Sequence, residues 1–108
     1  MMPLVRFVPA SDPRMRRTID AIRRELAEHG LVRRWTGAEE GGFVICSYWL
    51  ADCLAMAGEV EQAEAVFEAV TRHANVVGLL SEEIDTAAGE LIGNFPQAFS
   101  HVGLINAA

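Results

Sequence analysis

Four helical segments alternate between two kinds of surface, and this alternation is the strongest limit on how the chain can fold. Apolar periodicity and helix start and stop residues predict helices over about 12–29, 44–57, 59–74 and 95–107. The first and third carry one apolar stripe among charged residues, which is typical of helices with a face in water. The second and fourth are apolar on nearly every side, which indicates burial among several neighbours. The order is outer, inner, outer, inner, so we expect an all-α fold built like part of a concentric helical toroid.

The connections between these helices differ greatly in length. Gly58 alone separates the second helix from the third, whereas loops over about 30–43 and 75–94 precede the second and fourth helices. Loops beyond roughly 12–15 residues in a compact domain are usually functional or disordered, and these two are rich in apolar residues. Because both loops lead into inner helices, they should lie at the same end of the fold. We therefore expect a working surface there, at the N-termini of the second and fourth helices.

Charge and hydropathy narrow the classes of partner. The 108-residue chain has a net charge of −6, whereas binding to nucleic acid needs clustered Lys and Arg, so we expect no nucleic-acid partner. The basic residues on the first helix alternate with acidic ones, which favours a solvated, ion-paired face. Although 51% of the residues are apolar, no stretch reaches the roughly 18 of a membrane span. The apolar start, residues 1–5, lacks the features of a secretion signal. We expect no membrane partner and a cytoplasmic location.

Several residues with reactive side chains fit the interior better than a site. Cys46 and Cys53 are seven residues apart on one predicted helix, about 10 Å along its axis, which is too far for a disulfide. The chain shows no metal-ligand spacing, and we expect neither a metal nor an organic cofactor. Tyr48 and His101 stand on apolar helices, where such residues more often belong to the core than to a site.

Two adjacent carboxylates, Glu82 and Glu83, follow an apolar run in the second long loop. In an extended segment they would point to opposite sides, so one could enter a cleft while the other braces the loop. A carboxylate in a cleft can deprotonate a water molecule and so act as a general base. The same pair also fits a solvated acidic turn, and the spacing alone favours that interpretation.

Four further residues are candidates for binding a sugar. Glu40 precedes two glycines, which allow unusual backbone angles near a ligand or simply relieve a turn. Trp35 offers a flat face on which a sugar ring can stack. Asn94 and Gln97 stand at the start of the fourth helix and could orient sugar hydroxyls, although Asn94 also fits the N-cap of that helix.

Three segments, residues 40–52, 78–85 and 93–108, are similar in order and spacing to bacterial glucoamylase- and trehalase-like inverting glycoside hydrolases. The resemblance covers essentially the whole chain. It implies an (α/α)6 toroid of six helical hairpins, in which two glutamates invert the anomeric centre of an α-glucoside such as trehalose or a malto-oligosaccharide. Residues 1–108 would then be the C-terminal part of the catalytic domain, forming about two αα-hairpins. The N-terminal β-domain and most of the toroid would be absent.

The resemblance also assigns roles. It places the general base in the loop over 79–83, and we assign it to Glu82, with Glu83 as the alternative. The general acid would lie upstream, outside this chain, so the isolated chain should not hydrolyse glycosides. Inner helices without their neighbours would expose apolar faces, so we expect self-association or a second chain that completes the toroid.

A different function is also open at this stage. Residues 58–67 locally resemble helix-turn-helix repeats, which would make the chain a small interaction module without catalysis. Such arrays repeat with a period of roughly 34 residues, and the first and third predicted helices share no such similarity.

Overall fold

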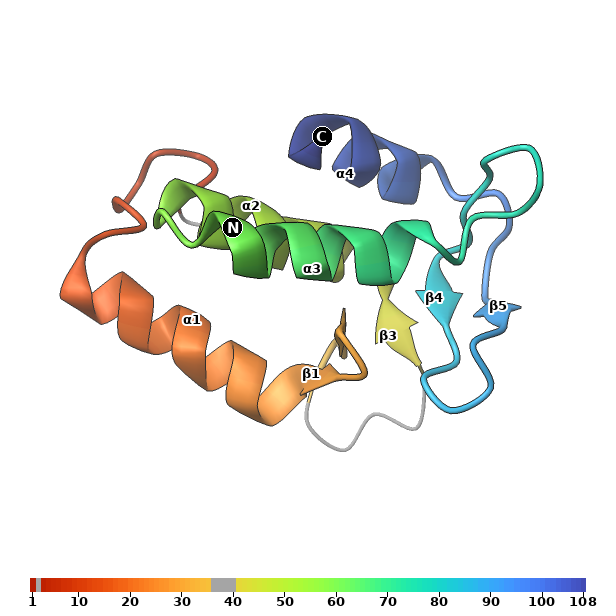
Figure 1. Cartoon of the computed structure of the whole chain (residues 1–108), viewed down its shortest axis with the longest axis horizontal. Coiled ribbons are helices and arrows are strands. Elements are labelled where there is room, and N and C mark those ends of the chain that lie inside the picture. The colour runs from red at the N-terminus through yellow and green to blue at the C-terminus, as the bar shows by residue number, and fades with distance from the viewer. Residues whose placement is uncertain (2, 36–40) are drawn as a thin grey trace.

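The computed structural model describes residues 1, 3–35 and 41–108, and it confirms four helices within them. Figure 1 shows α1 and α4 on opposite sides of a hairpin formed by α2 and α3. The bounds are Pro13–Leu26 for α1, Val44–Met56 for α2, Val60–Thr71 for α3 and Ala98–Ala107 for α4. The helices differ from the predicted ranges mainly at their ends, where the chain leaves helical geometry to make other hydrogen bonds.

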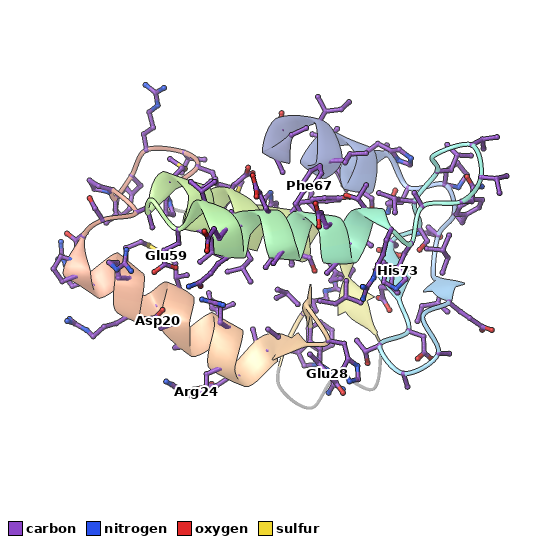
Figure 2. All side chains as sticks on the ribbon, viewed as in Figure 1. Asp20, Arg24, Glu28, Glu59, Phe67 and His73 are labelled. Carbon is purple, nitrogen blue, oxygen red and sulfur yellow. The ribbon has the colours of Figure 1, made fainter. Side chains whose placement is uncertain are left out.

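The predicted start of α1 is confirmed. The side chain of Asp12 accepts a hydrogen bond from the amide of Arg14 at 2.8 Å, and Pro13 occupies the first helical position. Hydrogen bonds from the side chain of Arg14, together with this backbone bond, lower the pKa of the Asp12 carboxyl. The same end of the helix also carries an ionic contact that links α1 to the start of α3. Arg16 lies 2.5 Å from Glu59, which sits between α1 and the start of α3 (Figure 2).

The prediction that α1 continues to residue 29 is wrong. The helix ends at Leu26, and the chain turns back through two short antiparallel strands, β1 (Ala27–Glu28) and β2 (Leu31–Val32). His29 and Gly30 between them have φ angles of 52° and 79°. Two consecutive residues with positive φ form the turn whose twist suits a β-hairpin, so local turn geometry ends the helix.

The all-α prediction is also only approximate, because the long loops contain short strands. β3 (Gly42–Phe43), β4 (Glu83–Ile84) and β5 (Leu91–Ile92) form an antiparallel sheet in that order. This pairing confirms that the two long loops meet at one end of the fold. Their backbone groups are partly buried there and need partners, and strand pairing across the two loops supplies them.

The core surrounds α2, as its sequence predicts. This helix packs against both α3 and α4, and Tyr48, Leu54 and Val44 on it are fully buried. The hydroxyl of Tyr48 lies 2.9 Å from the hydroxyl of Thr71 on α3. The interpretation of Tyr48 as a core residue is therefore confirmed. Cys46 and Cys53 are free thiols whose pKa values are raised by burial.

α4 has the composition of an inner helix but is covered on one side only. It packs on α2 at Gly103, where an added Cβ would lie 3.2 Å from the Tyr48 ring. The opposite side shows Phe99, Val102 and Ile105, which are 68%, 50% and 73% exposed. These residues recur every three positions and so lie on one face of the helix. The expected exposed apolar face is confirmed for α4.

The predicted start of α4 is wrong in detail. Its N-cap is Gln97, without a capping hydrogen bond from the side chain, and Asn94 lies three residues earlier. The reason is that the backbone before α4 makes hydrogen bonds to a different segment. The carbonyl of Asn94 and the amide of Gln97 both bind the loop that carries the paired glutamates, so the backbone stays extended until Gln97.

Candidate active site

The loop that carries the two glutamates is held between the start of α2 and the start of α4. The amide of Val44 donates to the carbonyl of Glu82 at 3.0 Å, and the amide of Glu82 donates to the carbonyl of Asn94 at 2.9 Å. Two residues earlier, the carbonyl of Leu80 accepts from the amide of Gln97 at 3.0 Å. The backbone at Glu82 is therefore fixed on both sides by elements distant in sequence.

The two carboxylates occupy different environments. Glu83 belongs to β4, opposite Phe43 of β3, and is only 9% exposed. Glu82 is half-buried, and one of its carboxylate oxygens, Oε2, lies 3.4 Å from the amide nitrogen of Asn94. Because neighbouring residues of an extended chain point to opposite sides, the burial of Glu83 leaves Glu82 as the more exposed carboxylate of the pair.

Gly93 has no side chain and so leaves room for the carboxylate of Glu82. An added Cβ at Gly93 would lie 3.2 Å from Oε2 and 3.3 Å from Cβ of Glu82. Gly93 also has a φ angle of 74°, a conformation that glycine adopts far more readily than other residues. The glycine thus allows the side chain of Glu82 to lie directly against the backbone that precedes α4.

Asn94 contacts Glu82, and Gln97 contacts Leu80, in both cases through main-chain groups that precede α4. Both atoms of the Asn94 peptide that bind Glu82, the carbonyl oxygen and the amide nitrogen, are main-chain groups. The Asn94 side chain is exposed and that of Gln97 is half-buried. Their predicted contacts with sugar hydroxyls stay predictions.

Trp35 lies in the first long loop, shortly after β2, and is 48% exposed. The guanidinium of Arg34 lies 4.8 Å from the centroid of its ring and 5.0 Å from that of Phe43, both within the range of cation–π attraction. Arg34 thereby links Trp35 to β3, the strand that pairs with Glu83. Glu40 lies outside the described residues.

The C-terminal half of the chain, residues 55–108, matches the family described as glycosyl hydrolases family 15. The chain belongs to this family. The matched half includes Glu82, Glu83, Asn94 and Gln97, so four of the predicted site residues lie in the part that defines the membership.

The family 15 chain is also similar to curated trehalases. It is 46% identical to the trehalase of Mycolicibacterium smegmatis over 96% of its length, and 44% identical to that of Mycobacterium tuberculosis over 99%. The trehalase of Thermoplasma volcanium is 37% identical over 99%. The chain spans only 17–18% of the length of these three relatives. No solved structure matches the chain.

Two residues of α4 that the sequence did not assign to the site contact the glutamate loop of this family 15 chain. The hydroxyl of Ser100 donates to the carbonyl of Ser81 at 2.7 Å, and both residues are buried. His101 contacts the amide of Leu80 through Nε2 at 3.2 Å. Both ring nitrogens of His101 have partners, so the expectation of a satisfied histidine is confirmed, but the residue is half-buried and does not belong to the buried core. Its partner Leu80 lies 21 residues away, and no local pattern reveals such a contact.

The family 15 chain also has a cavity away from the candidate site. A cavity of about 470 Å³ lies between α2, α3 and the C-terminal residues, and none of the predicted site residues lines it. Among the described residues, no three His, Cys, Asp or Glu side chains gather as metal ligands would. No helix in that same part of the chain is long and apolar enough to cross a bilayer.

Proposed function

We propose that this chain is the base-bearing segment of an inverting α-glucoside hydrolase, with trehalose as the first substrate to test and malto-oligosaccharides as the second. The observation that carries the proposal is the contrast between the two glutamates. Glu82 is fixed by backbone bonds and half-buried, whereas Glu83 is buried in the sheet. The similarity to proteins described as trehalases supports the choice of trehalose.

In this mechanism Glu82 is the general base. It removes a proton from a water molecule while the oxygen of that water forms a bond to the anomeric carbon, and the glycosidic oxygen leaves with a proton from a general acid. One carboxylate oxygen of Glu82 faces the amide of Asn94 at 3.4 Å, so the other can accept the proton. Inverting enzymes hold their two carboxyl groups about 6.5–9.5 Å apart to admit the water.

The general acid, on this proposal, belongs to a part of the enzyme outside this chain. Residues 1–108 are the C-terminal part of the catalytic (α/α)6 domain and contribute about two of its six hairpins. The α4 face with Phe99, Val102 and Ile105 meets either the rest of the toroid or another copy of the chain. The isolated chain has no hydrolytic activity. A cytoplasmic location stays a prediction.

The experiment has two parts. The purified chain is assayed with trehalose and maltose, and no turnover is expected. The chain then replaces the equivalent segment of the M. smegmatis trehalase, to which it is 46% identical. In that chimera Glu82→Gln should lower kcat by about 10²–10⁴-fold, the usual contribution of a general base. Glu83→Gln is the matched control and should mainly lower stability.

Product stereochemistry completes the test. An inverting hydrolase releases β-glucose from one half of trehalose, which proton NMR detects before mutarotation. Retention of configuration, or full activity of the Glu82→Gln chimera, would contradict the proposal. Turnover by the isolated chain that Glu82→Gln abolishes would contradict the assignment of the acid to another part of the enzyme.

A further inference from the structure

We propose that His101 is a positioning residue for the general base, acting through the amide of Leu80, and that it does so as the tautomer protonated on Nδ1. The inference rests on the proposed role of Glu82. It adds a residue from α4 to a site that would otherwise consist of one loop.

The two hydrogen bonds of His101 fix its tautomer. A backbone amide can only donate, so the Nε2 atom that lies 3.2 Å from the amide nitrogen of Leu80 must act as an acceptor. The ring proton therefore belongs to Nδ1, which lies 2.7 Å from the carbonyl oxygen of Gln97 and donates to it. Both ring nitrogens are occupied, one by the helix and one by the loop.

These bonds hold the loop at a point close to Glu82. Leu80 is fully buried, so its amide needs a partner inside the protein. Its carbonyl is bound by the amide of Gln97 at 3.0 Å. The start of α4 thus binds both backbone groups of Leu80. The main-chain amide of Gln97 binds its carbonyl, and the imidazole of His101 binds its amide.

The adjoining contacts transmit this position to the carboxylate. Ser81 is held by the hydroxyl of Ser100 at 2.7 Å, and Glu82 is held by the carbonyl of Asn94 at 2.9 Å. Three consecutive residues of the loop are therefore bound to the chain around the start of α4. Loss of the His101 contact removes one of the two bonds that hold Leu80, and this loosening lets the carboxylate move relative to the water it must activate.

A histidine that serves only the core would affect stability alone. A positioning role predicts a change in kcat that exceeds any change in KM, because substrate still binds but the base is displaced. Misplacement by about 1 Å can lower a rate on the order of 10²-fold. This difference separates the two interpretations.

The variants are His101→Gln and His101→Phe in the trehalase chimera that carries this segment. The Gln amide oxygen can reach the place of Nε2 and accept from Leu80, whereas Phe fills similar space without an acceptor. We expect His101→Phe to lower kcat for trehalose on the order of 10²-fold, with KM within about threefold of the parent value. His101→Gln should recover most of that loss. Unchanged kcat in folded His101→Phe would overturn the proposal.

A second measurement does not depend on activity or on Glu82. Nitrogen-15 NMR of the isolated chain distinguishes a protonated Nδ1 from a protonated Nε2, and hydrogen exchange of the Leu80 amide reports its bond. We expect a protonated Nδ1 and an amide that exchanges faster in His101→Phe than in His101→Gln. A protonated Nε2 would overturn the inference. Full activity of Glu82→Gln with protected Leu80 would instead refute the proposed base and leave the contact standing.

Discussion

A Cβ atom added to Gly41 would lie 1.9 Å from the carbonyl oxygen of Ile84. The neighbouring position is equally tight, since an added Cβ at Gly42 would lie 2.4 Å from Cβ of Leu31. The close approach of the two long loops therefore accounts for the glycine at position 41, and the close approach of β2 accounts for the glycine at position 42.

Gly41→Ala should disrupt the pairing of β3 with β4. The added methyl group would clash with the backbone of Ile84, which is paired in the sheet and cannot easily move away. Overpacking of this kind lowers the free energy of unfolding by about 1–3 kcal/mol. Urea denaturation of the isolated chain measures the free energy of unfolding. Gly58→Ala is the control, because nothing lies within 4 Å of its added Cβ although its φ is 84°. That variant should lose only about 1–2 kcal/mol from backbone strain. Gly41→Ala with the stability of the parent chain would contradict the close approach.

The buried hydroxyl of Tyr48 should make the fold sensitive to alkali. Burial raises the pKa of this phenol above its ordinary value of 10.0, and the hydrogen bond with Thr71 opposes that shift. The phenol therefore ionises in the unfolded chain first. Its contribution to stability is complete below pH 10 and is lost as the pH rises through the higher pKa of the folded state.

Tyr48→Phe should remove this part of the alkaline loss of stability and cost about 1 kcal/mol at neutral pH, where a hydrogen bond is lost. Urea denaturation between pH 7 and 11 gives both quantities. Thr71→Val, which removes the partner hydroxyl but keeps the phenol, should retain the alkaline loss. An identical pH dependence for Tyr48→Phe and the parent chain would contradict the assignment.

The exposed face of α4 should cause the isolated chain to associate. Phe99 and Ile105 are 68% and 73% exposed on one side of a helix, and contiguous apolar surface of this kind favours association. Sedimentation velocity over a range of concentrations should show a rising average mass. The double substitution Phe99→Glu and Ile105→Glu should shift the chain toward the monomer. Val76→Glu is the control, since Val76 is fully exposed in a loop. A parent chain that stays monomeric at all concentrations would argue against the interface.

The sequence predicts the elements of this fold better than their contacts. Apolar periodicity identifies all four helices and the burial of Tyr48, because these depend on neighbours along the chain. The paired strands are two residues each and join residues 42–43 to 83–84, so no local signal predicts them. Asn94 has the right residue type for an N-cap, but its backbone is engaged by Glu82.

The same distinction applies to the site. Spacing alone left Glu82 and Glu83 equivalent, and the family resemblance favoured Glu82. The strand register that buries Glu83 opposite Phe43 supports that proposal, and no local pattern predicts this register. Arg34 lies in a loop without a pattern that marks its role, yet its guanidinium lies near two aromatic rings. Contacts of this kind depend on how distant segments meet.

Gly93→Ala tests whether the space beside Glu82 matters for catalysis. The added methyl group would lie 3.2 Å from Oε2 of Glu82 and would push the carboxylate away from the amide of Asn94. In the trehalase chimera we expect kcat to fall roughly tenfold, which corresponds to about 1.4 kcal/mol of lost transition-state stabilisation. KM should change little, because the displaced group acts on water.

Gly78→Ala supplies the matched control in the same chimera. Gly78 has a φ of 82°, close to the 74° of Gly93, and nothing lies within 4 Å of its added Cβ. Both variants therefore carry similar backbone strain, but only Gly93→Ala contacts the carboxylate. If the two lower kcat equally, strain in the loop explains the loss. A larger fall for Gly93→Ala at equal thermal stability means that the position of the Glu82 carboxylate limits the rate, as expected of a general base whose geometry is set by the chain before α4.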